Sequence, residues 1–190
     1  MTLLTDAPPM TTDQMLALPD NGTMRELIRG HLKETDMTRR GRKHTRTATN
    51  VAELLRGWLK TQPEPRGEVL TGEAGFVLRR DPDTTVGIDL AYISAQAAQA
   101  NPDDVFLIEG APVLAVEILS PSDQQEDILD KVREYVRNGV KVVWVIEPVF
   151  KTVTVYRPDA PPALFNEEQN LDGGAHLPGF RTGVAEFFAR

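Results

Sequence analysis

The sequence has no cysteine, which excludes disulfides, thiolate zinc sites and cysteine nucleophiles. It contains no run of 18 apolar residues, so no transmembrane helix is predicted. The first ten residues, MTLLTDAPPM, lack the basic start and apolar core of a secretory signal. Aromatic residues make up only 6% of the chain, which leaves little stacking surface for sugars. We therefore expect a soluble protein of the cytoplasm with no membrane partner.

Several nucleotide-binding and hydrolase motifs are also missing. There is no GxGxxG after a strand, no GxxxxGK[ST] and no GxSxG. His31, His44 and His176 are scattered and show no metal-ligand spacing. The remaining candidates for chemistry are carboxylates that stand inside apolar segments.

The length and composition predict one domain over residues 1–190. Apolar residues make up 41% of the chain and charged residues 26%, as in ordinary globular proteins. A chain of this size buries roughly 70% of its unfolded surface, which is enough for a substantial core. We expect an N-terminal arm over residues 1–22 and a closing C-terminal segment over residues 176–190.

The net charge of −7 argues against nucleic-acid binding, but the charge is unevenly distributed. The stretch MTRRGRKHTR, residues 37–46, is basic and contains no acid. We predict a loop here, with two interpretations. It is either a solvated basic run or a segment that contacts phosphates through Arg39, Arg40, Arg42, Lys43 and Arg46.

Hydrophobic periodicity predicts most of the regular elements. Helices are expected near TDQMLAL and over residues 47–60, and strands with a turn over residues 24–34. Further strands are expected at residues 68–72, 75–80 and 86–93, followed by a connection over residues 94–110.

A strand, a helix and a strand follow in order near the middle of the chain. The run PVLAVEIL is typical of a strand buried on both faces. An amphipathic helix comes next and ends at Gly139, and KVVWVIE is a second buried strand. This order predicts two parallel strands joined by a helix, with KTVTVYR pairing back as a hairpin.

Two acids interrupt apolar strands: Asp89 in VGIDLAYI and Glu117 in PVLAVEIL. A buried carboxylate is costly unless something pairs with it. If the two strands are neighbours, the carboxylates converge, and a bound Mg²⁺ or Mn²⁺ removes their repulsion. Such a metal activates water and stabilises charge on a phosphodiester. The alternatives for Glu117 are a buried Arg or Lys partner, or a strand end that is open to water.

Lys131 lies at the border of the apolar stripe of the helix that follows the Glu117 strand. Because this helix can fold back beside the strand's end, its lysine could orient an attacking water or neutralise a phosphate. The alternative is a surface lysine whose stem covers apolar neighbours.

The segments IDLAYIS, PVLAVEILSPSD and DKVREYVRNGVKVVWVIEPVFKTVTVYRP resemble the Uma-type putative endonuclease family of the PD-(D/E)XK restriction-endonuclease-like superfamily. The resemblance extends upstream to RELIRGHL and HTRTATNVAELLRGWL, and downstream to LPGFRTGVAEFF. It therefore covers nearly the whole chain.

This resemblance implies an α/β fold with a mixed β-sheet core flanked by helices. It implies a metal-dependent phosphodiesterase site that contains Asp89 and Glu117. Leu119 stands where the wider superfamily has a lysine, and Lys131 is the implied replacement. The family places further acids near the site, here Glu26 and Glu73.

The expected function is that of a Mg²⁺- or Mn²⁺-dependent endonuclease acting on DNA. One alternative is a catalytically weak nuclease-fold protein that binds nucleic acid or a protein partner. Another is a carboxylate-based hydrolase of small molecules. A homodimer would suit an enzyme that cuts both strands of a duplex.

Overall fold

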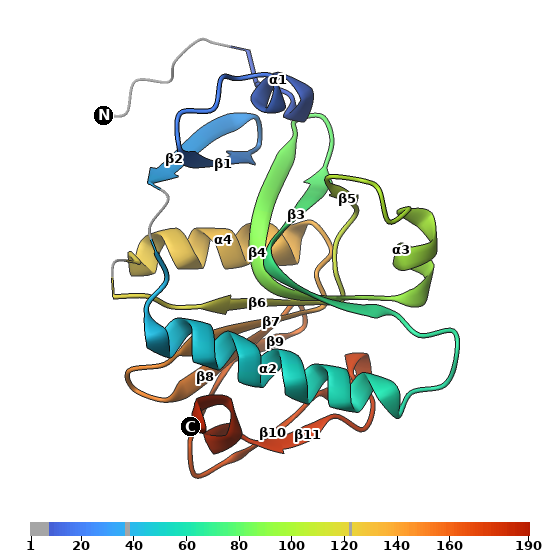
Figure 1. Cartoon of the computed structure of the whole chain (residues 1–190), viewed down its shortest axis with the longest axis vertical. Coiled ribbons are helices and arrows are strands. Elements are labelled where there is room, and N and C mark those ends of the chain that lie inside the picture. Colours follow the sequence, from blue (N-terminus) through green and yellow to red (C-terminus); the bar gives the residue numbers. More distant parts are fainter. Residues whose placement is uncertain (1–7, 37–38, 122) are drawn as a thin grey trace.

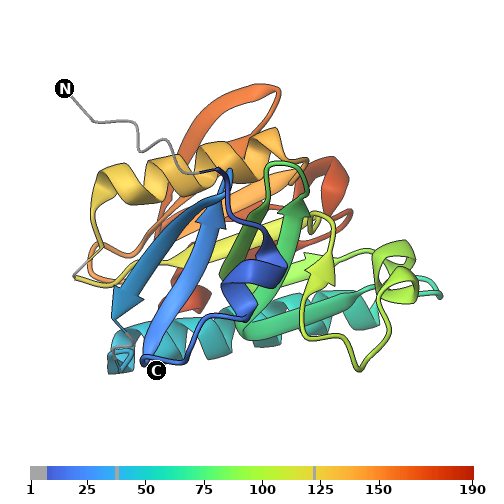
Figure 2. The same cartoon turned by 90° about the horizontal axis from the view of Figure 1, so that it is seen from above.

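The computed structural model describes residues 8–36, 39–121 and 123–190. Its centre is a mixed sheet of nine strands with helices on both sides (Figure 1), and the view from above shows how strongly the sheet is twisted (Figure 2). This is the α/β architecture that the sequence predicts. In chain order the elements are α1 (Thr12–Leu16), β1 (Thr23–Ile28), β2 (His31–Asp36), α2 (Arg42–Lys60), β3 (Glu68–Arg79), β4 (Thr84–Ile93), α3 (Ala95–Ala100), β5 (Ile108–Glu109), β6 (Leu114–Ile118), α4 (Gln125–Arg137), β7 (Val142–Glu147), β8 (Thr152–Arg157), β9 (Ala160–Asn166), β10 (Asn170–Asp172), η1 (Gly174–His176), β11 (Arg181–Gly183) and η2 (Val184–Phe188).

The middle of the sheet is the predicted strand–helix–strand unit. Strands β6 and β7 pair in parallel, from Leu114 opposite Val142 to Ile118 opposite Ile146. Helix α4 connects them, as the pattern predicts. Strand β8 pairs antiparallel with β7, which confirms the predicted hairpin, and β9 adds the last strand of this edge.

Strand β4 organises the other half of the sheet. One edge of β4 pairs with β3 from Thr84 to Ile93. Its opposite edge pairs with β1 only at Thr85 and with β6 only over Leu90–Tyr92. The residues between these two contacts have no strand partner on that edge. The sheet therefore opens at this point, and the opening positions the site described below.

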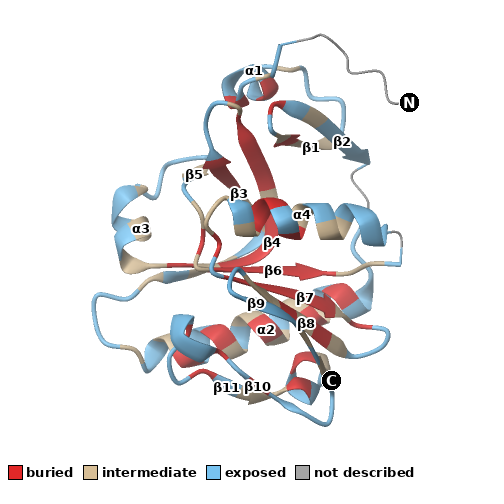
Figure 3. Cartoon of the chain, turned by 180° about the vertical axis from the view of Figure 1, so that it is seen from behind, coloured by how far each residue is buried: buried red, intermediate tan, exposed pale blue. Residues whose placement is uncertain are grey.

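Two apolar layers cover the sheet. On one face, Val51, Leu55 and Trp58 of α2 pack with Trp144 and with C-terminal side chains that include Phe187. On the other face, Val132 and Tyr135 of α4 pack on alternate residues of β7. Figure 3 shows buried positions alternating with exposed ones along both helices. The C-terminal segment contributes Phe187 to this core, where the side chain is fully buried.

Helix α2 begins earlier than predicted, and the basic segment is not simply a loop. Residues 37–38 lie outside the described residues, Arg39 and Arg40 precede the helix, and Arg42, Lys43 and Arg46 lie within it. The first turn carries no acid to complement the helix dipole, so local electrostatics do not favour this start. Burial explains it: His44 and Thr47 extend the inward-facing stripe by another two turns toward the N-terminus.

Two other segments differ from the prediction. The expected strands at residues 68–72 and 75–80 form one long strand, β3, whose pairing with β4 is interrupted by a bulge between Thr71 and Ala74. The connection over residues 94–110 contains α3 and the short β5. No helix in the described part of the chain is long and apolar enough to span a membrane.

Candidate active site

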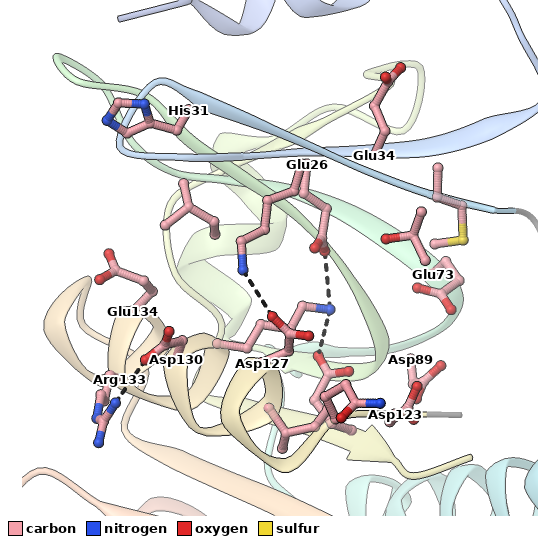
Figure 4. Close-up of a pocket in the computed structure, with 18 of the residues that line it drawn as sticks. Glu26, His31, Glu34, Glu73, Asp89, Asp123, Asp127, Asp130, Arg133 and Glu134 are labelled. Carbon is pink, nitrogen blue, oxygen red and sulfur yellow. Dashed lines mark hydrogen bonds and ion pairs between the residues drawn. The ribbon is translucent and has the colours of Figure 1, made fainter. Parts of the chain in front are cut away.

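A cleft of about 860 Å³ opens where β4 lacks a strand partner, between the β1–β2 hairpin and α4. The backbone of Gly87 lies at this gap, and side chains replace the missing strand. Its N–H donates to Glu26 Oε1 at 3.1 Å, and its carbonyl accepts from Lys131 Nζ at 3.1 Å. Glu26, Glu73, Asp89, Glu117 and Lys131 all line the cleft, so five predicted site residues come together there. Figure 4 labels three of them, Glu26, Glu73 and Asp89.

Glu117 is held on β6 by two contacts to the same carboxylate oxygen. The hydroxyl of Tyr135 donates to Oε1 at 2.5 Å, and Lys131 Nζ lies 3.5 Å from Oε1. Burial raises the pKa of Glu117 to about 8, because the attraction of Lys131 only partly offsets desolvation and the Asp89 carboxylate adds repulsion. No hydrogen bond reaches Oε2 from the described residues. This oxygen is available to a cation.

Lys131 joins three elements at the centre of the cleft. Its ammonium group lies 3.0 Å from Glu26 Oε1 on β1 and 3.5 Å from Glu117 on β6, and it donates to the Gly87 carbonyl on β4. Burial acts to lower the pKa of Lys131, but the surrounding negative groups, Glu117 first, hold it well above its usual value. The site therefore contains a fixed positive charge, and the lysine is not a surface residue.

Asp89 lies on β4 immediately before Leu90, the first residue of β4 that pairs with β6. Its Oδ2 accepts from the Ile118 backbone N–H at 2.8 Å, so the side chain continues the interrupted ladder. The Nε2 of His44 lies 3.3 Å from the same oxygen. Burial acts to raise the pKa of Asp89, but the hydrogen bonds from His44 and Ile118 outweigh it and lower the pKa. Asp89 is thus held as an anion, unlike Glu117.

Glu73 reaches the cleft because of the β3 bulge. Gly72 and Glu73 both have positive φ, at 88° and 61°, which turns the Glu73 side chain toward Gly87. Its carboxylate pairs with Arg40, which comes from the segment before α2. Burial raises the pKa of Glu73, and the Asp89 charge adds to this effect. Glu73 and Arg40 therefore form an ion pair at the edge of the site.

The donor set fits a hard divalent cation. Asp89 and Glu117 each have one oxygen fixed by the protein and one that accepts no hydrogen bond from the described residues. Among those residues no group of three or more acids and histidines is arranged to hold a metal. Mg²⁺ typically uses one or two protein carboxylates and completes its coordination with water and phosphate, so two acids can suffice.

The remaining basic residues lie beside this site and do not enter it as a group. Of the five residues predicted to contact phosphates, Arg40 is the one that lines the cleft. Arg39, Arg42 and Lys43 are exposed at the start of α2, whereas Arg46 is partly buried and its Nε has no hydrogen-bond partner within the described ranges. The five predicted residues therefore do not form one cluster. One lines the cleft, three are exposed, and Arg46 is partly buried.

Sequence reasoning missed two functional contacts. Tyr135 lies on the apolar face of α4, and the sequence gives no signal that its hydroxyl meets Glu117. His44 carried a detectable signal: with Thr47, Val51, Leu55 and Trp58 it follows the helical spacing of the buried α2 stripe. A histidine on such a stripe requires a polar partner, and the structure supplies Asp89.

The fold defines the class of protein. A crystal structure described as a putative nuclease from Anabaena variabilis ATCC 29413 matches with a TM-score of 0.78 and 20% sequence identity. The match covers 95% of this chain and 98% of that chain, so the fold is restriction-endonuclease-like. The Uma2 family model, described as "Putative restriction endonuclease", matches residues 12–185, and the chain belongs to this family. No curated protein matches the sequence.

Proposed function

We propose that this protein is a Mg²⁺- or Mn²⁺-dependent endonuclease that hydrolyses phosphodiester bonds in DNA. The observation that carries the proposal is the pairing of Asp89 and Glu117 in one cleft, each with one oxygen fixed and one available. The raised pKa of Glu117 supports it, because this carboxylate is not fully compensated by the protein alone. A cation held by the two acids would supply the missing charge.

Asp89 and Glu117 would hold the cation, which when bound supplies an activated water and stabilises charge on the phosphate. Asp89 contributes a carboxylate that is already ionised, since His44 and Ile118 stabilise its charge. Tyr135 fixes the rotation of the Glu117 carboxylate. Lys131 keeps its proton and places positive charge beside the reacting phosphate, as electrostatic stabilisation requires.

The exposed basic residues support DNA as the substrate. Arg39, Arg42 and Lys43 lie at the start of α2, and Arg40 connects that segment to the cleft through Glu73. Cations in this position can contact the phosphates that flank the reacting one. A homodimer related by two-fold symmetry would present two such clefts to a duplex, one for each strand.

The test is nicking of supercoiled plasmid with Mg²⁺, with Mn²⁺ and with EDTA. We expect nicking only with metal, and a loss of orders of magnitude in Glu117→Gln, because the metal contributes both the nucleophile and charge stabilisation. Glu168→Gln changes an exposed glutamate and should leave nicking unchanged. Metal-independent nicking, or equal loss in both variants, would refute the proposal.

A second candidate is a catalytically weak nuclease-fold protein that binds nucleic acid or a protein partner. One observation favours it: Glu26 and Glu117 already pair with Lys131, and Glu73 pairs with Arg40. These protein cations compete with a metal for the same carboxylates. Plasmid binding without nicking under every metal condition would support this candidate over the first.

A further inference from the structure

The contact between His44 and Asp89 joins two elements that are far apart in the chain. His44 lies in the first turn of α2 and is 7% exposed, and its Nε2 is 3.3 Å from Asp89 Oδ2. A carboxylate can only accept, so the imidazole presents its N–H from Nε2. This contact is separate from that of Lys131, whose ammonium group lies 3.5 Å from Glu117 Oε1.

The two donors to Asp89 determine which of its oxygens is available. His44 and the Ile118 N–H both approach Oδ2, and no hydrogen bond reaches Oδ1 from the residues that the structure describes. Two donors on one oxygen oppose rotation of the Asp89 carboxylate about its Cβ–Cγ bond. Oδ1 is therefore presented in a defined direction before any ligand binds.

Packing alone does not explain a histidine at this position. Its Nδ1 is buried and has no hydrogen-bond partner within residues 8–36, 39–121 and 123–190. A buried polar atom without a partner is unfavourable, and an apolar side chain would fill the α2 stripe without that cost. The hydrogen bond from His44 Nε2 to Asp89 offsets the cost of leaving Nδ1 without a partner.

We infer that His44 is a positioning residue that orients Asp89 for binding the divalent cation, an inference that rests on the proposed function. A partner behind a metal ligand fixes its orientation and raises its affinity, and losing such a partner typically weakens metal binding 10–100-fold. His44 itself does not touch the cation. Its effect is transmitted through the carboxylate of Asp89.

The test is isothermal titration of the full-length protein with Mn²⁺, which measures metal affinity without DNA or turnover. His44→Leu removes the donor and keeps a buried apolar side chain, and we expect Mn²⁺ to bind 10–100-fold more weakly. In His44→Gln the amide nitrogen reaches the place of Nε2, so affinity should return to about wild type. His176→Leu changes an exposed histidine and serves as the matched control.

Circular dichroism in EDTA first establishes that each variant is folded. If His44→Leu does not fold, the comparison of His44→Gln with His44→Asn still tests the inference. The shorter asparagine amide cannot reach Asp89, so we expect the His44→Asn variant to bind Mn²⁺ more weakly than His44→Gln. Mn²⁺ binding that is lost in Asp89→Asn but unchanged without a donor at position 44 would overturn this inference alone. A wild type that binds no Mn²⁺ would overturn the proposed function together with it.

Discussion

Lys131 Nζ lies 3.0 Å from Glu26 Oε1, which joins helix α4 to strand β1 across the cleft. The same ammonium group lies 3.5 Å from Glu117, so one cation serves two carboxylates that come from opposite sides of the sheet opening. These groups are largely shielded from water, with the lysine side chain 19% exposed. This differs from the exposed pair between Lys33 and Asp127 in the same cleft.

Replacing Lys131 with Met should destabilise the protein by roughly 3–5 kcal/mol, because Glu26 and Glu117 then lose their shared cation. Lys33→Met is the matched control, and its loss should stay below about 1 kcal/mol because that pair is exposed. Urea unfolding at pH 7 measures both values. Similar losses in the two variants would show that Lys131 is not a central part of the site.

Replacing Glu117 with Gln separates its structural role from its role as a ligand. Without metal we expect a change within about 1 kcal/mol, because the raised pKa of Glu117 leaves its carboxyl group largely uncharged at pH 7 and Lys131 keeps its contacts to Glu26 and Gly87. With Mn²⁺ at a hundredfold excess over its Kd, the wild type should gain about 2.7 kcal/mol.

The glutamine variant should gain much less stability from Mn²⁺. Thermal melts of both proteins in EDTA and in Mn²⁺ make the comparison. A loss of roughly 3–5 kcal/mol that is independent of metal would instead identify Glu117 as a structural partner of Lys131. In that case its assignment as a metal ligand would be withdrawn.

The central part of the fold follows from the sequence because its signals are strong and local. The runs around Glu117 and Trp144 are continuously apolar, as strands buried on both faces require, and the stripe of α4 is unbroken. Long-range contacts account for what was missed. The early start of α2 follows the local spacing of His44 and Thr47, but the polar partner of His44 lies 45 positions later, and no local pattern encodes that contact.

The residues of the site, like the elements of the fold, could be predicted only in part from the sequence. Asp89 and Glu117 could be chosen from the sequence because a charge inside an apolar strand is conspicuous. Lys131 could also be placed near Glu117, because it lies on the helix that follows the Glu117 strand. Tyr135 could not, since it lies within an apolar stripe. The placement of Glu73 depends on a bulge that locally resembles a break between two strands. The geometry of the bulge appears only when β3 is paired with β4.

Reversing the exposed charges of Arg39, Arg42 and Lys43 to Glu should weaken DNA binding and its dependence on salt. Each lost phosphate contact lowers the slope of log affinity against log salt by about 0.9. Fluorescence anisotropy with a short duplex, in Ca²⁺ to limit cleavage, gives this slope. Arg181→Glu reverses an exposed charge on β11 and is the control. An unchanged slope would show that these residues form a solvated basic surface that does not contact DNA.

Asp83 provides a test of the fold that is independent of the site. This buried carboxylate anchors α1 to the turn before β4: its Oδ2 accepts from the backbone N–H and the hydroxyl of Thr12, both at 2.7 Å, and from Arg80 at 3.1 Å. Burial acts to raise the pKa of Asp83, but the hydrogen bonds from Thr12 and its other donors lower it to about 2. Asp83→Asn can turn an N–H toward these donors, so we expect a loss of roughly 2–3 kcal/mol at pH 7.

The pH dependence of that loss has a definite sign. A carboxyl group whose folded-state pKa is depressed stabilises the folded protein above its unfolded value, near 3.8 for Asp83, and this contribution is lost as the pH falls toward about 2. The difference between wild type and Asp83→Asn should therefore be constant from pH 7 to about pH 5 and shrink below pH 4. Urea unfolding at pH 7, 5 and 3 measures it, with the exposed Asp159→Asn as a control that should stay within about 0.5 kcal/mol. A difference that is equally large at pH 3 and pH 7 would show that the ionised carboxylate is not what holds α1 in place.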